Sequence, residues 1–489
     1  MRVCSALKAW RPSGSSGLGV LRGRAEGFVC ADHRLTKIAM HLHKELHICS
    51  GARCRSHSTH RLMVIRLMRT HVIATLTYVG LLFSGQPLLA AVPADVSVEI
   101  SHWWVSPGEK DSVDVLRRHM ANRHIQLRER VFAGSGTHRY GDAVRQRVEA
   151  GKPPMAAQVI GYDIHHWARL GKLVNLDQIA AEQDWQGVVP EGIQHLSKYQ
   201  GHWYAVPITA HSTNWLWVNH AQFMRLGLQQ PDSWLDLLAM LDAAKADGLI
   251  ALAIGREPWE HTLLFESVAA GAGGAEFYRR VFLELDKSAL DANLLEEIFR
   301  RMSVLRNYLD PAFATRSWDQ ATDLVRSGKA LLQVQGSWVN GEFNKYGLVP
   351  GQDYECFRFP DTQGMFLFNS DQYMLFNDNP SDQQTRLNFV SMLMDPELQR
   401  ELNITTGAAP ARVDINRTTF NRCGQQAITD MRGANMRRTL MGSIAMGNAN
   451  PGEVKQAIYQ VVHEHLLGRL SDKQAASRLE HVIATAKYQ

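Results

Sequence analysis

The segment 96–109 ends in residues whose side chains can bind a flat, polar ligand. Two adjacent tryptophans, Trp103 and Trp104, precede a Ser-Pro-Gly turn at 106–108, and Glu109 follows directly. Indole rings stack on flat apolar surfaces such as the faces of a sugar ring, and a carboxylate accepts hydrogen bonds from hydroxyl groups. The combination indicates a ligand-binding loop. The alternative is that both tryptophans are ordinary core residues, since indole side chains are usually well buried.

Hydrophobic periodicity predicts the elements that position this loop. Residues 96–100 alternate between apolar and polar side chains, which favours a half-buried strand, and 109–120 carry apolar residues at helical spacing. The same strand–loop–helix order recurs from 126 to 173, so we expect a parallel, doubly wound α/β sheet with its loops at one rim. Neighbouring strand residues point to opposite faces, so Trp103 and Trp104 can share one core only if the chain turns there.

A second region begins after residues 203–218, where Pro207 interrupts the strand pattern. This region is rich in helices and contains a predicted strand at 330–335 that leads to another tryptophan, Trp338. Residues 366–376 are expected to run back to the first region as one strand. A chain that crosses more than once between two α/β lobes forms a hinged clamp, with the ligand in the cleft between them.

The net charge of +5 is unevenly distributed along the 489 residues. Residues 1–94 hold 13 Lys and Arg against 3 Asp and Glu, which leaves 40 basic and 45 acidic side chains for the remainder. The predicted folded part is therefore mildly acidic, and no nucleic-acid partner is expected. A hydrophobic fraction of 45% with 21% charged residues is ordinary for a globular protein.

The N-terminal part has the pattern of a secretion signal. Arg66 and Arg69 precede the uncharged apolar run 72–83, and small residues follow to Ala94. This order of basic, apolar and small residues is typical of a cleaved signal peptide, and the apolar run is short for a membrane span. We therefore predict a signal peptide at 63–94, a misassigned or disordered upstream segment at 1–62, and a periplasmic mature chain from 95 to 489.

No motif for a cofactor or a metal ion is present. The glycines at 134 and 136 form a lone GxG without a phosphate-binding lysine or a dinucleotide fingerprint, so no cofactor is predicted. Four of the six cysteines lie in 1–62 without a CxxC pair, and no metal site is predicted. Only Cys356 and Cys423 belong to the predicted mature chain; they either form a disulfide or remain two free thiols.

Several segments together resemble glucose/mannose-type extracellular solute-binding proteins of sugar ABC transporters, in the family 1 class. They are HWWVSPGE, GHWYAVPITAHSTNWLWVN, FESV, SWDQAT, GSWVNGEF and FNSDQYMLF, in order and at comparable spacing between about 97 and 412. The resemblance implies an α/β, two-lobed periplasmic-binding-protein fold, type II-like, with a hinged cleft. Lobe 1 would take about 95–207 plus part of 366–489, and lobe 2 about 215–365. It further implies a monomeric receptor, not an enzyme, that closes on a sugar and delivers it to permease subunits in the inner membrane.

The resemblance also implies which side chains contact the sugar. The stacking and hydroxyl-binding residues that match the family pattern are Trp103, Trp104, Glu109, Trp318, Trp338 and Asp371. His211 and Asn214 are two further candidates for the cleft, and a purely structural role is equally well supported for them. Four further positions depart from the pattern, because smaller or apolar residues replace its polar ones: Ile160, Ser337, Thr406 and Met446. A site that lacks hydrogen-bond partners for buried hydroxyls loses about 1–3 kcal/mol for each of them. A different sugar, deoxygenated or larger, is therefore as well supported as glucose.

Three other functions fit parts of the sequence. A sugar-sensing subunit would use the same closure to signal to a membrane kinase or chemoreceptor. A related receptor that has lost its affinity for sugar would explain the four departures. A glycosidase would need two carboxylates about 5–10 Å apart across the bond that is cleaved, and Glu109 and Asp371 are the only pair we can suggest for it.

Overall fold

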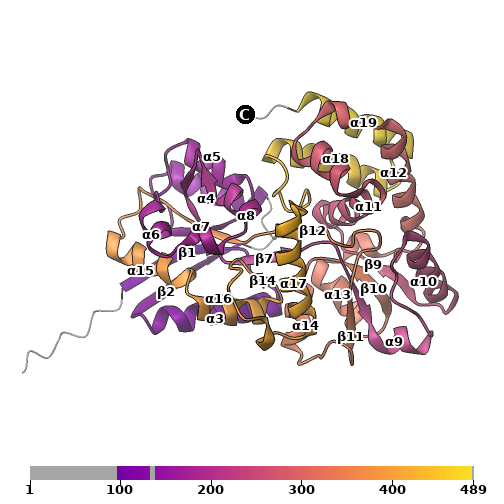
Figure 1. Cartoon of the computed structure of the whole chain (residues 1–489), viewed down its shortest axis with the longest axis horizontal. Helices are drawn as coiled ribbons and strands as arrows, with labels where there is room; N and C mark the ends of the chain where they lie inside the picture. Colours follow the sequence, from indigo (N-terminus) through magenta and orange to yellow (C-terminus); the bar gives the residue numbers. More distant parts are fainter. Residues whose placement is uncertain (1–95, 133–137, 487–489) are drawn as a thin grey trace, which may run out of the picture. The chain divides into compact units, whose positions relative to one another are not determined.

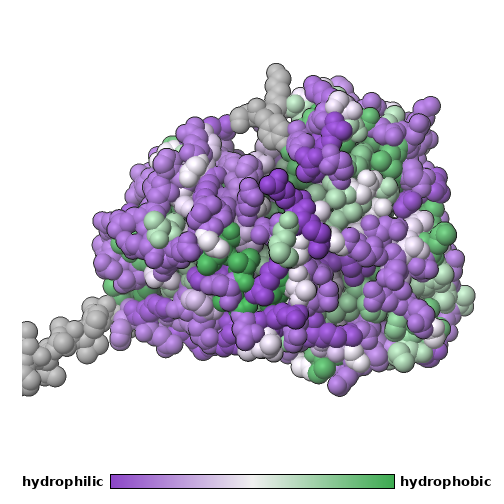
Figure 2. Space-filling view, viewed as in Figure 1, coloured by the Kyte–Doolittle hydropathy of each residue, from purple (hydrophilic) through white to green (hydrophobic). Residues whose placement is uncertain are grey.

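The computed structural model describes residues 96–132 and 138–486 (Figure 1). The predicted upstream segment, the signal peptide and the glycines at 134 and 136 lie outside the described residues. No helix of the described part is long and apolar enough to span a membrane. The face shown in Figure 2 is mostly hydrophilic.

The first lobe is built on a five-stranded sheet in the order β2-β1-β3-β13-β6. Its strands are β1 (Val96–His102), β2 (Ile125–Val131), β3 (Ala156–Val159), β6 (Ala205–Pro207) and β13 (Gln372–Leu375). The helices of this lobe are α3 (Pro107–Ala121), α4 (His138–Glu149), α5 (Asp163–Arg169), α6 (Asp177–Glu182), α7 (Trp185–Val188), α8 (Glu191–Ser197), α15 (Gln383–Leu393) and α16 (Pro396–Thr406), and a small hairpin joins β4 (Lys198–Tyr199) to β5 (His202–Trp203). The predicted repetition of strand, loop and helix is confirmed for β1 to α5. The sheet is mixed, however, and not wholly parallel, because β13 runs antiparallel to both β3 and β6.

The second lobe is built on a four-stranded sheet in the order β11-β8-β10-β9. Its strands are β8 (Trp215–Asn219), β9 (Ile250–Ala253), β10 (Ala330–Val334) and β11 (Tyr354–Arg358). Its helices are α9 (His220–Arg225), α10 (Trp234–Ala246), α11 (Pro258–Tyr278), α12 (Ala292–Arg306), α13 (Trp318–Arg326), α14 (Trp338–Lys345), α18 (Gly452–Leu466) and α19 (Asp472–Thr485), with short helical turns at Arg279–Leu283, Lys287–Ala289 and Phe313–Thr315. The C-terminal helices α18 and α19 pack against α11 and α12, so the chain returns to this lobe at its end (Figure 1).

A third sheet, in the order β14-β7-β12-β15, lies between the two lobes. It consists of β7 (Thr209–Ser212), β12 (Phe366–Asn369), β14 (Ala409–Pro410) and β15 (Leu440–Gly442), with helix α17 (Arg422–Arg437) against it and a helical turn at Arg417–Thr419. The prediction of one strand over 366–376 is wrong. The chain leaves β12 at Asn369 and enters β13 of the first-lobe sheet at Gln372, so Ser370 and Asp371 form a crossing between sheets.

Two such crossings run side by side. The chain also passes from β6 to β7 through Ile208, whose backbone N–H donates to the carbonyl oxygen of Asp371 (2.9 Å). Paired extended segments that join two lobes are a suitable hinge, because a small number of backbone torsions can absorb the lobe rotation. The lobe limits expected from the sequence, about 95–207 with part of 366–489 for lobe 1 and about 215–365 for lobe 2, stay a prediction.

One covalent link supplements the packing. Cys356 of β11 and Cys423 of α17 form a disulfide, with Cα atoms 6.1 Å apart. Of the two states that the sequence left open for these cysteines, the bonded one is therefore present. The bond ties the edge of the second-lobe sheet to the helix that covers the third sheet.

Candidate functional site

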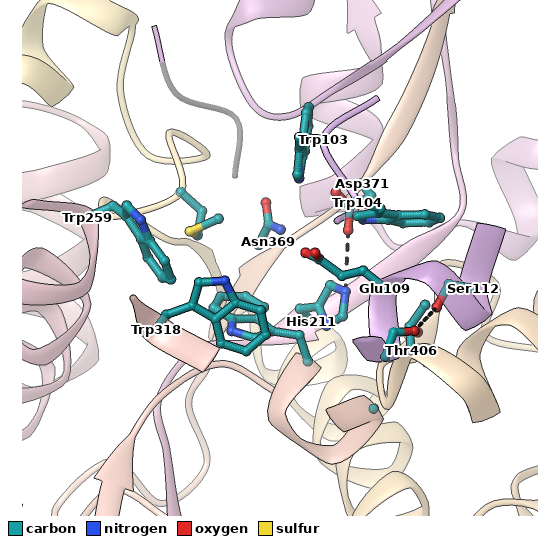
Figure 3. A pocket seen from close by; sticks show the side chains of 14 residues that line it. Trp103, Trp104, Glu109, Ser112, His211, Trp259, Trp318, Asn369, Asp371 and Thr406 are labelled. Atoms are coloured by element: carbon teal, nitrogen blue, oxygen red, sulfur yellow. Dashed lines mark hydrogen bonds and ion pairs between the residues drawn. The ribbon is translucent and has the colours of Figure 1, made fainter. Parts of the chain in front are cut away.

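A pocket of about 510 Å³, counting its opening to solvent, lies between the lobes (Figure 3). Aromatic, carboxylate and amide side chains line it together with small residues: Trp103, Trp104, Gly108, Glu109, Ser112, His211, Trp259, Trp318, Trp338, Gly341, Asn369, Asp371, Thr406 and Met446. Nine of the positions singled out in the sequence, Met446 included, are among these residues.

The chain turns after β1, so that both adjacent tryptophans reach the pocket. Strand β1 ends at His102, and Trp103 and Trp104 lie beyond it, each at most 5% exposed. The Trp103 backbone N–H donates to Gln158 Oε1 (3.2 Å), and its ring packs edge-on against Tyr140 with centroids 5.0 Å apart. Both indoles are thus buried and both face the pocket, which the alternation of a continuing strand would not allow.

Three tryptophans of the second lobe line the same pocket as Trp103 and Trp104, and each lies at the N-terminus of a helix. Trp318 and Trp338 are the first residues of α13 and α14, and Trp259 is the second residue of α11. The Trp338 ring lies 5.4 Å from that of His211 and 6.0 Å from that of Trp259, between centroids. Trp259 was not predicted. Its position directly after Pro258 at the start of a helix is the same signal that Trp318 gives after Ser317, and it could have been found in that way.

The carboxyl group of Glu109 holds the start of α3 with one oxygen and faces the pocket. Glu109 is the third residue of α3, and its Oε2 accepts from the backbone N–H groups of Val105 and Ser106 (2.9 and 2.8 Å) in a capping box. The carboxyl group points toward the middle of the pocket (Figure 3). Burial of this group raises its pKa to about 7, even though the two backbone donors and Ser106 act in the opposite direction. Its Oε1 makes no hydrogen bond within the described part of the chain and is available to a ligand.

Asp371 lies in the crossing between β12 and β13 and is 3% exposed. Its Oδ1 accepts from Gln158 Nε2 (2.8 Å), its Oδ2 accepts from Thr209 Oγ1 (3.2 Å), and His211 Nε2 lies 3.3 Å from Oδ2. A buried carboxylate needs such partners, and these three contacts supply them. Gln158 also holds the Trp103 backbone, which links the stacking residue to the carboxylate.

The remaining predicted positions fall into three groups. Thr406 and Met446 line the pocket. Ser337 lies behind it, buried, with its hydroxyl 3.0 Å from His211 Nδ1. Ile160 lines a neighbouring hollow together with Trp103 and Trp167. In the described part of the chain, no group of three or more histidine, cysteine or acidic residues is arranged to hold a metal ion.

Three buried carboxyl groups should make stability depend on pH. Burial raises the pKa of Glu109 and Glu266 to about 7 and that of Glu260 to about 8, from 4.5. Between pH 4.5 and these values the folded protein holds protons that the unfolded chain has released, so the contribution of these groups to the free energy of unfolding falls as pH rises. From pH 7.5 to 8.5, above the interval in which a histidine with the ordinary pKa of about 6.5 titrates, we expect a fall of roughly 1 kcal/mol.

Urea unfolding at fixed pH values would measure this fall. The variant Glu260→Gln should lose most of it, because the Glu260 pKa of about 8 lies within this interval. A free energy of unfolding that stays level or rises over the same interval would contradict the assignment of these protonation states.

The fold and the pocket together define a class of protein. The chain has two α/β lobes joined by paired crossing segments, and a pocket lined by aromatic rings lies between them. This arrangement is typical of a solute receptor that closes on its ligand. The chain belongs to the bacterial extracellular solute-binding protein family, whose profile matches residues 131–399. This match confirms the predicted family and the predicted two-lobed fold. It also confirms the prediction that the chain is a receptor and not an enzyme.

Relatives cover nearly the whole chain. It is 39% identical to a protein of Brucella suis over 88% of this chain and all of the relative, and 40% identical to one of Rhizobium meliloti over 82% of this chain and 97% of the relative. Both are named probable sugar-binding periplasmic protein. The fold is similar to that of the bacterial solute receptor AcbH, with a TM-score of 0.68 and 14% identity over 79% of this chain and 98% of that one.

Proposed function

We propose that this protein is a periplasmic receptor that captures a sugar by closing its two lobes and delivers it to the permease of an ABC transporter. The observation that carries the proposal is the convergence of five indole rings from both lobes on one pocket that also holds the carboxylates of Glu109 and Asp371. Rings bind the apolar faces of a sugar, and carboxylates accept its hydroxyl protons.

The names of the relatives support a sugar as the ligand, since two proteins about 40% identical are called sugar-binding. The same names support the periplasm, reached by way of the predicted signal peptide at 63–94. We further propose that the receptor acts as a monomer, without a nucleic-acid partner. The binding roles of Trp103, Trp104, Glu109, His211, Trp318, Trp338 and Asp371 are part of this proposal.

Closure can act as the signal for delivery because residues of both lobes line one pocket. Trp103 and Glu109 belong to the first lobe, and Trp259, Trp318 and Trp338 to the second. A ligand that contacts both sets binds the closed form more tightly than the open form and so shifts the equilibrium toward closure. The permease would then recognise the closed surface.

Two positions where smaller or apolar residues replace the polar ones of the family pattern also bear on the choice of sugar. Met446 contributes a thioether, which is only a weak acceptor, and Thr406 contributes a hydroxyl that accepts from the Ala408 backbone N–H (3.3 Å). A sugar hydroxyl placed against the thioether would meet no strong partner. We therefore propose a sugar that carries hydrogen or an apolar group on this side, not glucose itself.

A stability screen tests the function directly. The mature chain, from residue 95 onward, would be melted with a panel of mono- and oligosaccharides, deoxy sugars included. A sugar at about 100 times its dissociation constant should stabilise the fold by about 2.7 kcal/mol. The variant Trp103→Ala should melt cooperatively and lose this response, because stacking in the pocket is removed.

A matched control is Trp234→Ala. Trp234 lies on α10 with the guanidinium of Arg301 5.0 Å from its ring centroid, and it is not among the pocket residues. This variant should respond to the sugar like the parent. A Trp103→Ala protein that responds equally well would remove Trp103 from the site, and a parent that responds to no sugar of the panel would contradict the proposed function.

A further inference from the structure

The side-chain amide of Asn369 lies in the pocket, yet its orientation is decided by a residue outside it. Asn369 ends β12 and is 2% exposed, and it occupies the middle of the view in Figure 3. Its Oδ1 accepts a hydrogen bond from Asn448 Nδ2 (3.0 Å). Among the described residues no hydrogen bond is made by Asn369 Nδ2, although this atom carries two hydrogens.

Asn448 can adopt only one amide orientation at this place. Its Nδ2 donates to two carbonyl oxygens, Asn369 Oδ1 and the backbone oxygen of Met446, both at 3.0 Å. The Met446 oxygen belongs to the backbone and cannot turn, so a flipped Asn448 amide would place its oxygen against that acceptor and lose the bond, whichever way Asn369 is turned. The side chain is 2% exposed, and its Oδ1 has no hydrogen-bond partner, so the bond to Met446 fixes the group.

The segment that carries Asn448 is itself held firmly to the second lobe. The buried carboxylate of Glu266 on α11 accepts from Ser443 Oγ and from the backbone N–H of Ala445 (2.9 Å). Tyr459 of α18 donates its hydroxyl to the Ala445 carbonyl oxygen. Asn448 is therefore presented to Asn369 by a rigid turn.

We propose that Asn448 is a positioning residue that turns the Nδ2 of Asn369 into the pocket as a fixed hydrogen-bond donor beside the carboxylates of Glu109 and Asp371, and that this arrangement selects a neutral hydroxyl over an ammonium group. A hydroxyl can accept from Asn369 and donate to a carboxylate at once. An ammonium group can donate to the carboxylates, but it has only hydrogens to offer and therefore opposes the fixed donor of Asn369. This selection rests on the proposed sugar-binding function.

The substitution Asn448→Asp tests the positioning. An aspartate has nearly the same shape but presents oxygen to Asn369, so Asn369 should flip, donate to the new carboxylate and turn its own oxygen into the pocket. The control is Asn450→Asp. Asn450 is equally buried in the same segment, and its Nδ2 donates to the carbonyl oxygen of Phe282 and not to Asn369.

The first measurement is selectivity between matched ligands. Affinities would be determined for glucose and glucosamine, galactose and galactosamine, and mannose and mannosamine. We expect the parent and Asn450→Asp to prefer the neutral member of the pair that binds best by at least tenfold, and Asn448→Asp to shift that ratio by at least tenfold toward the amino sugar. A uniform loss of affinity in both variants would overturn the positioning role, because a structural defect does not change the ratio.

The second measurement needs no ligand. Hydrogen exchange of side-chain amides, followed by NMR, should show rapid exchange for Asn369 in the parent and in Asn450→Asp, and slowed exchange in Asn448→Asp, where the group gains an acceptor. Unchanged exchange in Asn448→Asp would overturn the proposal. A parent that bound none of the six sugars would count against the proposed function, and this second measurement would still decide the role of Asn448.

Discussion

A Gly161→Ala variant is expected to bind the sugar at least about 100-fold more weakly than the parent, a loss of roughly 2.7 kcal/mol. Gly161 lies between β3 and α5 of the first lobe, and it contacts Gly447 of the turn that is held to the second lobe. A Cβ atom at Gly161 would lie 1.8 Å from the Gly447 carbonyl oxygen. That oxygen also accepts from the Tyr162 backbone N–H (3.2 Å). An alanine would therefore prevent the lobes from meeting.

The expected effect falls on closure and not on folding. Either lobe alone retains its core in the variant, but the form in which both sets of tryptophans reach the ligand becomes less populated, and the apparent affinity falls by the same factor. Calorimetry with the sugar from the stability screen would give the affinity. Small-angle scattering should show that the sugar compacts the parent and does not compact Gly161→Ala.

Gly171→Ala is the matched control. Gly171 follows α5 with a φ of +65°, close to the +57° of Gly161, so alanine meets comparable backbone strain at both positions. A Cβ atom at Gly171 would have no neighbour within 4 Å. This variant should bind and close like the parent. Equal affinities for the two alanine variants would show that the contact between Gly161 and Gly447 is not needed for closure.

Loss of the disulfide should have the largest effect on folding. The Cys356–Cys423 bond closes a loop with a sequence separation of 67 residues. On the chain-entropy estimate, a loop of this length stabilises the folded state by about 4 kcal/mol. The double variant Cys356→Ser/Cys423→Ser should therefore unfold at a clearly lower urea concentration than the parent.

Reductant provides an internal check. The predicted mature chain contains only these two cysteines. A reducing agent should lower the unfolding midpoint of the parent to that of the double variant and leave the double variant unchanged. A parent with the same midpoint under oxidising and reducing conditions would show that the bond contributes little to stability.

The sequence determined the local elements and the chemical types of the site residues. Alternation of apolar residues before Trp103 gave β1, and the Ser-Pro-Gly turn before Glu109 gave the start of α3, because both depend on interactions between residues a few positions apart. Segments with the family pattern then indicated the fold and most of the pocket residues, Trp318, Trp338 and Asp371 among them.

Only the tertiary structure decided where the chain crosses between sheets and which side chains converge. The residues 366–376 have the pattern of one strand, but Ser370 and Asp371 form a crossing between sheets, since hydrophobic periodicity reports burial and does not report in which sheet a strand lies. The rings of Trp259 and Trp338 lie 6.0 Å apart although 79 positions separate them. The contacts of Ser337 with His211, and of Asn448 with Asn369, are also set by packing between distant segments, and no local pattern encodes them.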